Sequence, residues 1–508
     1  MYLVFTASKD TYITNKIINS STRATDANLG AASTIDLFKL YDETNISGET
    51  SPRELSRGLI KFNLDDISAS LKSKTSFDHS SFNCVLKLHD VQGNQIAPSD
   101  FSLAVFPLSK SFDEGLGRDV SGLSYLDRTN WLTASFTNTN NVWNGSGAGA
   151  SGSLGSSNID IIEYGTIVAG TQTYLVSTQA FEKGSEDLEV DVTTIVSGAM
   201  CGVLPNHGFL IAYSGSQETD HQSRFVKRFA SRHSRSPYIR PKLIVRYDDS
   251  RLDSNENFEF NVTSSLFLES FSRGSRTNLI SGSAASSVTG HNCILLKLHT
   301  GSFSTIFTGS QYYSSGVPST GIYSASFAID QYVSESVTPV GTLAQFAAAS
   351  GSITFGQEWL STDENVSYFS GSLTIDTQNN TNTGVSKNIA VNITNLAPEY
   401  KSSDTPELKV FVRDLVAQHK SVRMPRRLPS LVLNQAYYRI RDPYIGKILT
   451  PFVKNGNGTR ISSRKDGMYF KPSLAHLPAG KSYTIDILVV ENGIDRIYET
   501  NSIFKVNS

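Results

Sequence analysis

The sequence is poor in several residue types, and each scarcity excludes a class of protein. Three cysteines, Cys84, Cys201 and Cys293, are spread widely over 508 residues. Neither a disulfide framework nor a paired-cysteine metal site is therefore expected. No apolar run reaches the roughly 18 residues that a membrane-spanning helix needs, and residues 1–5 lack the basic leader of a secretory signal. We expect a protein without a membrane span that is made in a reducing cytoplasm.

Charge is scarce as well. Asp, Glu, Lys and Arg make up 18 % of the chain, and the net charge is −2, whereas a charged fraction of about 25 % is typical. Such a chain is not a globally basic nucleic-acid-binding protein, so nucleic acid is not an expected partner, although a local basic patch stays open. Hydrophobic residues, at 39 %, are abundant enough to build packed cores, which excludes a wholly disordered chain.

Catalytic motifs are missing too. The chain has no nucleophile elbow, no zinc-protease helix motif, no phosphate-binding loop and no dinucleotide fingerprint. Its nine histidines are scattered, and none pairs with another at metal-ligand spacing. Asp113 and Glu114 form an acidic pair, but neighbouring residues of a strand point to opposite faces. We therefore expect no enzyme, no cofactor and no metal site.

Alternating apolar and polar residues dominate the chain, as at 59–64, 188–193, 243–247 and 408–413. A period of two is typical of half-buried antiparallel strands, and clusters of Ser, Gly, Asn and Asp between them are typical of turns. Helical signals are few and short, at 66–74, 194–200, 343–349 and 415–420. The pattern predicts an all-β chain of tandem β-sandwich or jelly-roll domains.

Two polar stretches mark the expected domain boundaries. Residues 247–257 are polar and follow a strong strand, and residues 417–429 are basic and punctuated by proline. We place the domains at 1–250, 251–416 and 417–508. The last is predicted to be a small Ig-like β domain, with 483–490 as a central strand and Asn492-Gly493 in a hairpin turn.

A faint internal repeat links the first two domains. Residues 83–89 resemble 292–299, residues 241–246 resemble 406–413, and the two pairs occur in the same order. Either a duplication or convergent strand composition explains the likeness.

A basic cluster is the sharpest local feature, because no Asp or Glu occurs between residues 221 and 246. Such a cluster could contact a partner subunit, a phosphate or an acidic glycan, or could pair internally with acids such as Asp191 or Glu189. Together with the linker arginines, the candidate partner interface consists of Arg224, Lys227, Arg228, Arg232, Arg235, Arg423, Arg426 and Arg427.

A Gly- and Ser-rich tract at 144–157 follows Trp143 directly. Such tracts form flexible loops, and a loop anchored by an aromatic residue could carry a contact site or be a plain insertion. Aromatic side chains are also the usual platform for a sugar, although tryptophans more often lie in a core. The candidate glycan platform consists of Tyr125, Trp131, Trp143 and Trp359.

The first domain resembles a known family of β-sandwich modules. The resemblance lies in residues 10–13, 28–30, 59–64, 111–115, 188–196, 206–211 and 240–245. Together these segments resemble the DNRLRE-type modules, with Phe112 in place of the usual Trp of a Trp-Asp-Glu element. The resemblance implies a jelly-roll fold and permits glycan binding. A long insertion at 117–179 departs from the compact module of the family.

The whole chain is similar to uncharacterised virion structural proteins of tailed phages, notably marine myoviruses. The segments that carry this likeness are 5–15, 109–115, 225–229 and 467–470. The resemblance implies a non-enzymatic subunit of a virion neck, tail or baseplate, with other virion proteins and copies of itself as partners. The alternative is a glycan-binding module on a particle or cell surface, with a polysaccharide as partner.

Overall fold

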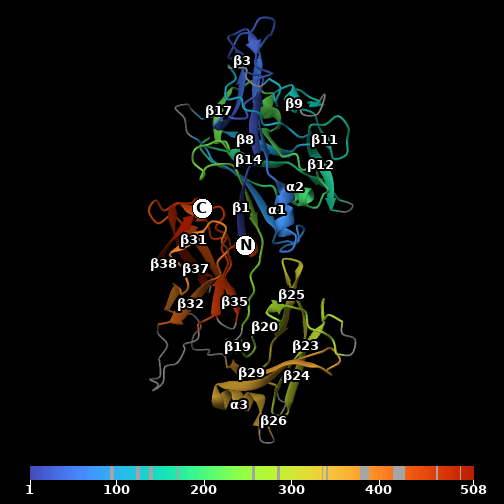
Figure 1. Cartoon of the computed structure of the whole chain (residues 1–508), viewed down its shortest axis with the longest axis vertical. Helices are drawn as coiled ribbons and strands as arrows, with labels where there is room; N and C mark the ends of the chain where they lie inside the picture. Colours follow the sequence, from blue (N-terminus) through green and yellow to red (C-terminus); the bar gives the residue numbers. More distant parts are fainter. Residues whose placement is uncertain are drawn as a thin grey trace. The chain divides into compact units, whose positions relative to one another are not determined.

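The computed structural model describes residues 1–508 except 92–96, 122–125, 137–140, 169–170, 255–257, 283–285, 334–335, 339–340, 378–387, 416–429, 465–466 and 492. It divides into two compact units. The N-terminal unit comprises residues 3–73 and 82–246, and the C-terminal unit comprises residues 1–2, 74–81 and 247–508. Strands make up most of the regular structure, which confirms the all-β prediction (Figure 1).

Two antiparallel sheets form the N-terminal unit. The smaller sheet has the strand order β1 (Tyr2–Thr6), β18 (Lys242–Arg246), β7 (Asn83–Leu88) and β15 (Leu188–Asp191). The larger has the order β14 (Ser177–Phe181), β8 (Phe101–Pro107), β16 (Phe209–Tyr213), β6 (Arg53–Lys61), β5 (Thr34–Tyr41) and β17 (Arg224–Ala230), with β2 (Lys9–Thr14) paired to β6. Around them lie α1 (Leu64–Leu71), α2 (Thr193–Met200), η1 (Gly215–Glu218), β3 (Ile17–Ile18), β4 (Thr22–Arg23), β9 (Thr133–Ser135), β10 (Asn141–Val142), β11 (Ser151–Ser153), β12 (Ile161–Val168) and β13 (Thr171–Tyr174).

The long insertion covers the outer face of the larger sheet. All five residues of β16 are buried, although a strand with one solvated face would alternate. Leu210 and Ala212 of β16 belong to one buried cluster with Trp131 and Trp143 of the insertion. The insertion therefore supplies a second hydrophobic core rather than a surface appendage.

The family-like segments meet around one buried side chain, Asn28. Its amide nitrogen donates to the backbone oxygens of Glu114 and Thr129, and its oxygen accepts from the N–H groups of Gly30 and Gly117. A Cβ atom at Gly30 would lie 1.8 Å from the Glu114 oxygen, so only glycine fits. These motif residues hold the fold together.

The first part of the C-terminal unit is one strongly curled sheet rather than the expected second sandwich. Its strand order is β19 (Phe258–Glu259), β29 (Ser367–Asp376), β28 (Ser352–Leu360), β23 (Ile294–Thr300), β24 (Phe303–Ser314), β25 (Val317–Phe327) and β20 (Ser264–Glu269). Phe258 of the edge strand β19 packs on Phe327 of β25, the strand next to the other edge, at 5.4 Å between ring centroids, so the sheet curls toward a barrel-like closure. Smaller elements are β21 (Phe271–Ser272), β22 (Ser275–Arg276), β26 (Ser336–Thr338), β27 (Gly341–Thr342) and α3 (Leu343–Ser350).

The remaining strands form a two-sheet, Ig-like sandwich around one core. One sheet has the order β30 (Ile389–Ile393), β32 (Leu408–Asp414), β36 (Gly467–Phe470) and β35 (Ser462–Arg464). The other has the order β31 (Glu399–Lys401), β38 (Ile494–Asn507), β37 (Lys481–Glu491), β33 (Ala436–Arg441) and β34 (Ile448–Thr450), and η3 (Asn455–Asn457) lies nearby. The predicted central strand, β37, is confirmed, whereas Asn492 of the predicted turn lies outside the described residues.

This pairing moves the boundary that we expected between residues 416 and 417. Strands β30, β31 and β32 precede that point, yet they pair with strands of the sandwich that follows it. A basic, proline-rich stretch marks a connection, but it does not show whether the strands on its two sides belong to one sheet. The sheets place the division between β29 and β30.

The same pairing bears on the internal repeat. β18 pairs with β7 in the N-terminal unit. In the repeat, β23 corresponds to β7 and β32 corresponds to β18. However, β32 pairs with β30 and β36 and does not pair with β23. Because the second half of the repeat has no equivalent place in the fold, the structure favours convergent strand composition over duplication.

Of the expected helices, three correspond to α1, α2 and α3, whereas 416–420 of the fourth lies outside the described residues. Within the described part of the chain, none of the helices is long and apolar enough to cross a membrane.

Candidate functional site

The basic cluster of the N-terminal unit is largely neutralised within that unit. The Arg224 guanidinium donates to both carboxylate oxygens of Asp220, at 2.9 and 2.7 Å. Arg228 makes the same two-bond contact with Asp36, at 2.9 and 2.7 Å. Hydrogen bonds from Arg224 hold the pKa of Asp220 well below its usual range, and the hydrogen bond to Asp36 raises the pKa of Arg228.

Lys227 is more deeply placed, with no exposed side-chain surface. Its ammonium group donates to the Asp90 carboxylate at 2.5 Å and to the backbone oxygens of Gly184 and Glu186 at 2.8 Å. Burial lowers the pKa of Lys227, and the Asp90 carboxylate acts against that effect.

The candidate interface is therefore corrected. Arg224, Lys227 and Arg228 hold strands and loops of one unit together, so they are not a free surface for a partner. Internal pairing was one of the alternatives, but the acids that we named are not the partners: Glu189 pairs with Lys87, and Asp191 accepts from Asn83. Arg235 is exposed. Arg423, Arg426 and Arg427 lie outside the described residues.

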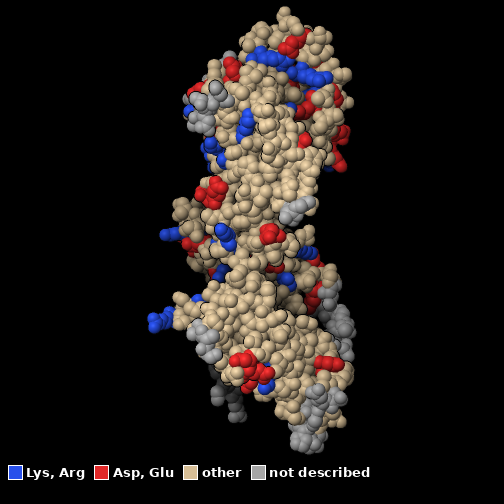
Figure 2. All heavy atoms as spheres, turned by 90° about the vertical axis from the view of Figure 1, so that its right-hand side faces the viewer, with Lys and Arg blue, Asp and Glu red and all other residues tan. Residues whose placement is uncertain are grey.

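Figure 2 shows one face of the molecule with small, scattered groups of both charges on a mostly uncharged surface. Among the described residues, that face therefore carries no extended patch of positive or negative charge that would indicate a binding site.

The tryptophans do not form an exposed glycan platform. Trp131 is 6 % exposed, Trp143 is 5 % exposed and Trp359 is fully buried. The Trp143 ring N–H donates to the Asn130 backbone oxygen at 2.9 Å, and the Arg57 guanidinium lies over the Trp131 ring at 5.5 Å. The platform prediction is wrong for these three residues, because Trp131 and Trp143 form the core under the insertion and Trp359, on β28, belongs to the core of the curled sheet in the C-terminal unit. Tyr125 lies outside the described residues.

The Gly- and Ser-rich tract folds around a buried carboxylate. Asp160 accepts hydrogen bonds from the backbone N–H groups of Asn144, Gly145 and Ala150 at 2.8–3.1 Å. The Lys110 ammonium lies 3.7 Å from the same carboxylate and balances its charge. These contacts hold the tract in a defined loop. Its Gly- and Ser-rich composition predicts a flexible loop instead.

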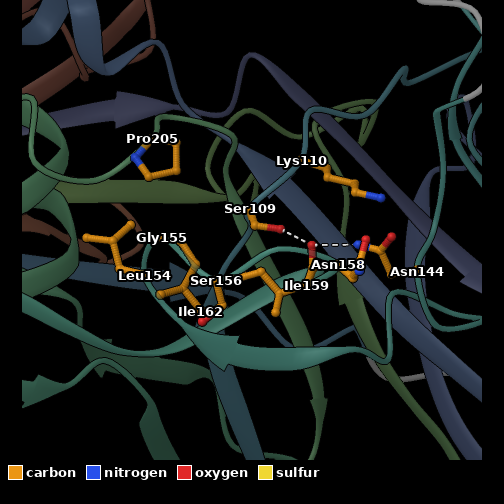
Figure 3. Close-up of a pocket in the computed structure, with 10 residues that line it drawn as sticks. All are labelled: Ser109, Lys110, Asn144, Leu154, Gly155, Ser156, Asn158, Ile159, Ile162 and Pro205. Carbon is orange, nitrogen blue, oxygen red and sulfur yellow. Dashed lines mark hydrogen bonds between the residues drawn. The ribbon is translucent and has the colours of Figure 1, made fainter.

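An open pocket of about 370 Å³ lies beside this loop (Figure 3). The side chains of Ser109 and Asn144 donate to the same backbone oxygen, that of Ile159. The pocket combines amide and hydroxyl groups with an aliphatic wall, and carries little net charge. Its lining residues are Ser109, Lys110, Asn144, Leu154, Gly155, Ser156, Asn158, Ile159, Ile162 and Pro205.

The acidic pair splits in the structure, as neighbouring residues in an extended chain should. Asp113 accepts from the Ser135 hydroxyl at 2.6 Å and from the Phe136 N–H at 3.0 Å. Glu114 turns elsewhere, and its Oε1 accepts from the Asp10 backbone N–H at 3.0 Å and from Arg232 Nε at 2.6 Å. The two carboxylates therefore do not act together.

Glu114 instead forms a cluster with Asp10 and His233. One ligand atom from each of the three lies within 4.8 Å of the others. Burial raises the pKa of Asp10 to about 7; a hydrogen bond from the Arg232 N–H opposes this, and the Glu114 charge adds to it. This cluster was not predicted from the sequence, although Asp10 and Glu114 both lie in the family-like segments.

A rigid apolar turn is the clearest exposed feature of the C-terminal sandwich. Between β33 and β34, Tyr444 is 81 % exposed and Ile445 is 68 % exposed. The buried Asp442 carboxylate accepts from the N–H groups of both residues, at 2.9 and 3.2 Å, and the Asp442 backbone oxygen accepts from Gly446. Ile448, 48 % exposed, follows on β34. The sequence signal was available, since turns normally carry polar residues at such positions.

Comparisons with known proteins give distant likenesses only. No protein-family model and no curated protein matches the chain. Trypsin-activated α2-macroglobulin from Escherichia coli is similar over 91 % of this chain, at 7 % identity and a TM-score of 0.16, and this chain spans 23 % of its length. The FN1–FN3 domains of chicken CNTN1 are similar over 83 % of this chain and 96 % of theirs, at 9 % identity and a TM-score of 0.14.

Cadherin domains 1–4 of protocadherin γB7 are similar over 56 % of this chain and 62 % of theirs, at 11 % identity and a TM-score of 0.13. At such scores these likenesses carry no functional argument.

Proposed function

We propose that this chain is a non-enzymatic structural subunit of a phage virion, associated with the neck, tail or baseplate, and that it works through protein–protein contacts of its β domains. The phage assignment rests on the sequence resemblance. The observation that carries the contact role is the apolar turn of Tyr444, Ile445 and Ile448. Exposed apolar side chains on a rigid support are typical of a protein-binding surface.

Two further observations support this reading. Arg224, Lys227, Arg228 and Arg232 form ion pairs within the N-terminal unit, which suits a rigid building block. The apolar turn is held in the free chain by hydrogen bonds that the N–H groups of Tyr444, Ile445 and Gly446 donate to Asp442, so little conformational entropy is lost when a partner covers it.

The test is the incorporation of the chain into particles from its source, measured by quantitative mass spectrometry. We expect a small fixed copy number matching the symmetry of a ring. The Tyr444→Ser, Ile445→Ser double variant should fold normally but be lost from particles. Tyr332→Ser is the matched control, because Tyr332 is also an exposed tyrosine, 72 % exposed, in another domain. Absence of the native chain from particles would overturn the proposal.

The pocket beside the Asn144–Asn158 loop supports a second candidate function, binding of a neutral glycan. Amide and hydroxyl groups hydrogen-bond sugar hydroxyls, and an aliphatic wall suits the carbon–hydrogen face of a sugar ring. The test is a titration with neutral oligosaccharides followed by NMR. Binding should be lost in Asn158→Ala and kept in Asn278→Ala, which lies outside the pocket. Equal binding by both variants would exclude this pocket.

A further inference from the structure

We propose that Asp10, Glu114 and His233 form a binding site for a divalent transition metal of the zinc class. The residues come from three separate parts of the N-terminal unit: strand β2, the connection after β8, and the loop between β17 and β18. Within the described residues, no other group of three Asp, Glu, His or Cys side chains brings its ligand atoms this close together.

The donor set suits such a metal. Zinc binds imidazole nitrogen and carboxylate oxygen at about 2.0–2.2 Å, with four ligands in a tetrahedron. Ligand atoms of such a site lie about 3.4 Å apart. His233 Nε2 is already 3.4 Å from Glu114 Oε1. All three ligand atoms lie within 4.8 Å of one another, so small side-chain rotations bring them to the distances of a zinc site. A water molecule would supply the fourth ligand.

The charges of the cluster are unbalanced in a way that a cation would correct. Two carboxylates, Asp10 and Glu114, face one guanidinium, that of Arg232. The Asp10 residue is 1 % exposed, so water does little to stabilise its charge. Within the described part of the chain, its carboxylate accepts one hydrogen bond, from the Arg232 N–H. A carboxylate that is so little exposed and accepts a single hydrogen bond is weakly compensated.

The site is open to an incoming ion from the side of His233. The side chains of His233 and Arg232 are 32 % and 34 % exposed, respectively. Arg232 now occupies Glu114 Oε1, the oxygen that the metal needs. Because Arg232 is partly exposed, it can turn toward solvent when a metal enters. The guanidinium and the metal therefore compete for the same carboxylate.

Metal binding would tie together chain segments that are far apart in sequence. A ligand that binds only the folded state stabilises it in proportion to its affinity. The proposed site is thus a structural clamp on the N-terminal strand, and it requires no catalytic role.

The first experiment is thermal unfolding of the full chain, stripped with a chelator and then titrated with ZnCl₂ or, as a comparison, MgCl₂. We expect zinc at about a hundredfold excess over its dissociation constant to raise the Tm of the N-terminal unit by about 5 °C or more. Magnesium should have little effect. CoCl₂ should give the visible absorption of tetrahedral cobalt.

Three variants make the test specific. His233→Ala should bind zinc at least about tenfold more weakly and lose the cobalt absorption, while its metal-free Tm stays near that of the native chain because His233 is exposed. His221→Ala, another exposed histidine of the same unit, should bind as the native chain does. Arg232→Gln should bind zinc more tightly, because the competing cation is gone.

Absence of zinc binding by the native chain would overturn the proposal. So would equal binding by His233→Ala and the native chain, which would indicate adventitious binding only. If Arg232→Gln binds zinc no more tightly than the native chain, the proposed competition between Arg232 and the metal for Glu114 is overturned.

Discussion

At the scale of single residues, buried ion pairs dominate the N-terminal unit. Lys227 has no exposed side-chain surface, and the Asp90 side chain is 11 % exposed. The Lys227 ammonium also lies 5.2 Å and 4.8 Å from the centroids of the Phe181 and Phe229 rings. Removing one partner of such a pair leaves an uncompensated charge in a poorly solvated place, which costs far more than the pair itself contributes.

We therefore expect Lys227→Met to destabilise the N-terminal unit by about 3–5 kcal/mol, measured by urea unfolding. Arg235→Ala is the control, because Arg235 is exposed, and its effect should stay within about 0.5 kcal/mol. A loss of less than about 1 kcal/mol for Lys227→Met would show that Asp90 is adequately solvated without the lysine.

Asp187 predicts a pH dependence. Burial acts to raise its pKa, but hydrogen bonds from His89 and the Asp90 N–H outweigh burial and lower the pKa to about 2. A carboxyl whose folded pKa lies below its unfolded value of 3.8 stabilises the fold above that value. The contribution is lost as the pH falls from about 4 toward 2.

The expected result is that Asp187→Asn lowers the stability of the N-terminal unit at pH 7 and flattens its dependence on pH below about 4. Unfolding in urea at a series of pH values measures both effects. An unchanged slope in the variant would assign the acid sensitivity to other carboxyl groups.

At the scale of elements, the insertion seals one face of the larger N-terminal sheet. Gly147 lies directly against the Trp131 ring, and a Cβ atom there would lie 2.5 Å from the ring carbons. Its φ of +75° is also unfavourable for other residues. The loop can cover the tryptophan only with glycine at this position.

Gly147→Ala should therefore destabilise the N-terminal unit by more than about 2 kcal/mol and change the fluorescence of Trp131. Gly155→Ala separates the two causes, because Gly155 has a φ of +86° but open space around it. That variant should cost only the backbone strain, about 1 kcal/mol. Equal losses for the two variants would mean that contact with Trp131 is unimportant.

At the scale of the whole molecule, strand pairing sets the domain boundary. Ile389, Val391 and Val410 lie in the same buried core as Tyr483 and Phe504. A chain that begins at residue 417 lacks β30, β31 and β32, and exposes the core that they cover.

We expect a fragment of residues 388–508 to unfold cooperatively, and a fragment of residues 417–508 to lack a cooperative transition. Circular dichroism and NMR peak dispersion distinguish the two. Cooperative folding of the shorter fragment would restore the boundary that composition suggested.

The ion pairs of the basic cluster also decide where assembly can be tested. Because Arg228 and Arg232 pair with Asp36 and Glu114, we expect charge reversal at these two residues to disturb the fold. Such variants would not report on a partner interface alone. The exposed turn at Tyr444 and Ile445 is the cleaner place to test assembly.

Local patterns in the sequence predict the all-β class, a strand that begins at residue 188, the strand at 483–490 and the three short helices; the strand from 188 ends at Asp191, before α2 begins at Thr193. These features follow from local periodicity, because a strand shows its buried face within a few residues. The sequence also predicted that Asp113 and Glu114 would diverge, for the same local reason.

Which distant residues meet is visible in the folded chain alone. The tertiary structure paired Lys227 with Asp90, buried Trp131 and Trp143 under the insertion, joined β30–β32 to the C-terminal sandwich, and gathered Asp10, Glu114 and His233. Such contacts depend on strand order and register across the whole chain, and no local pattern carries that information.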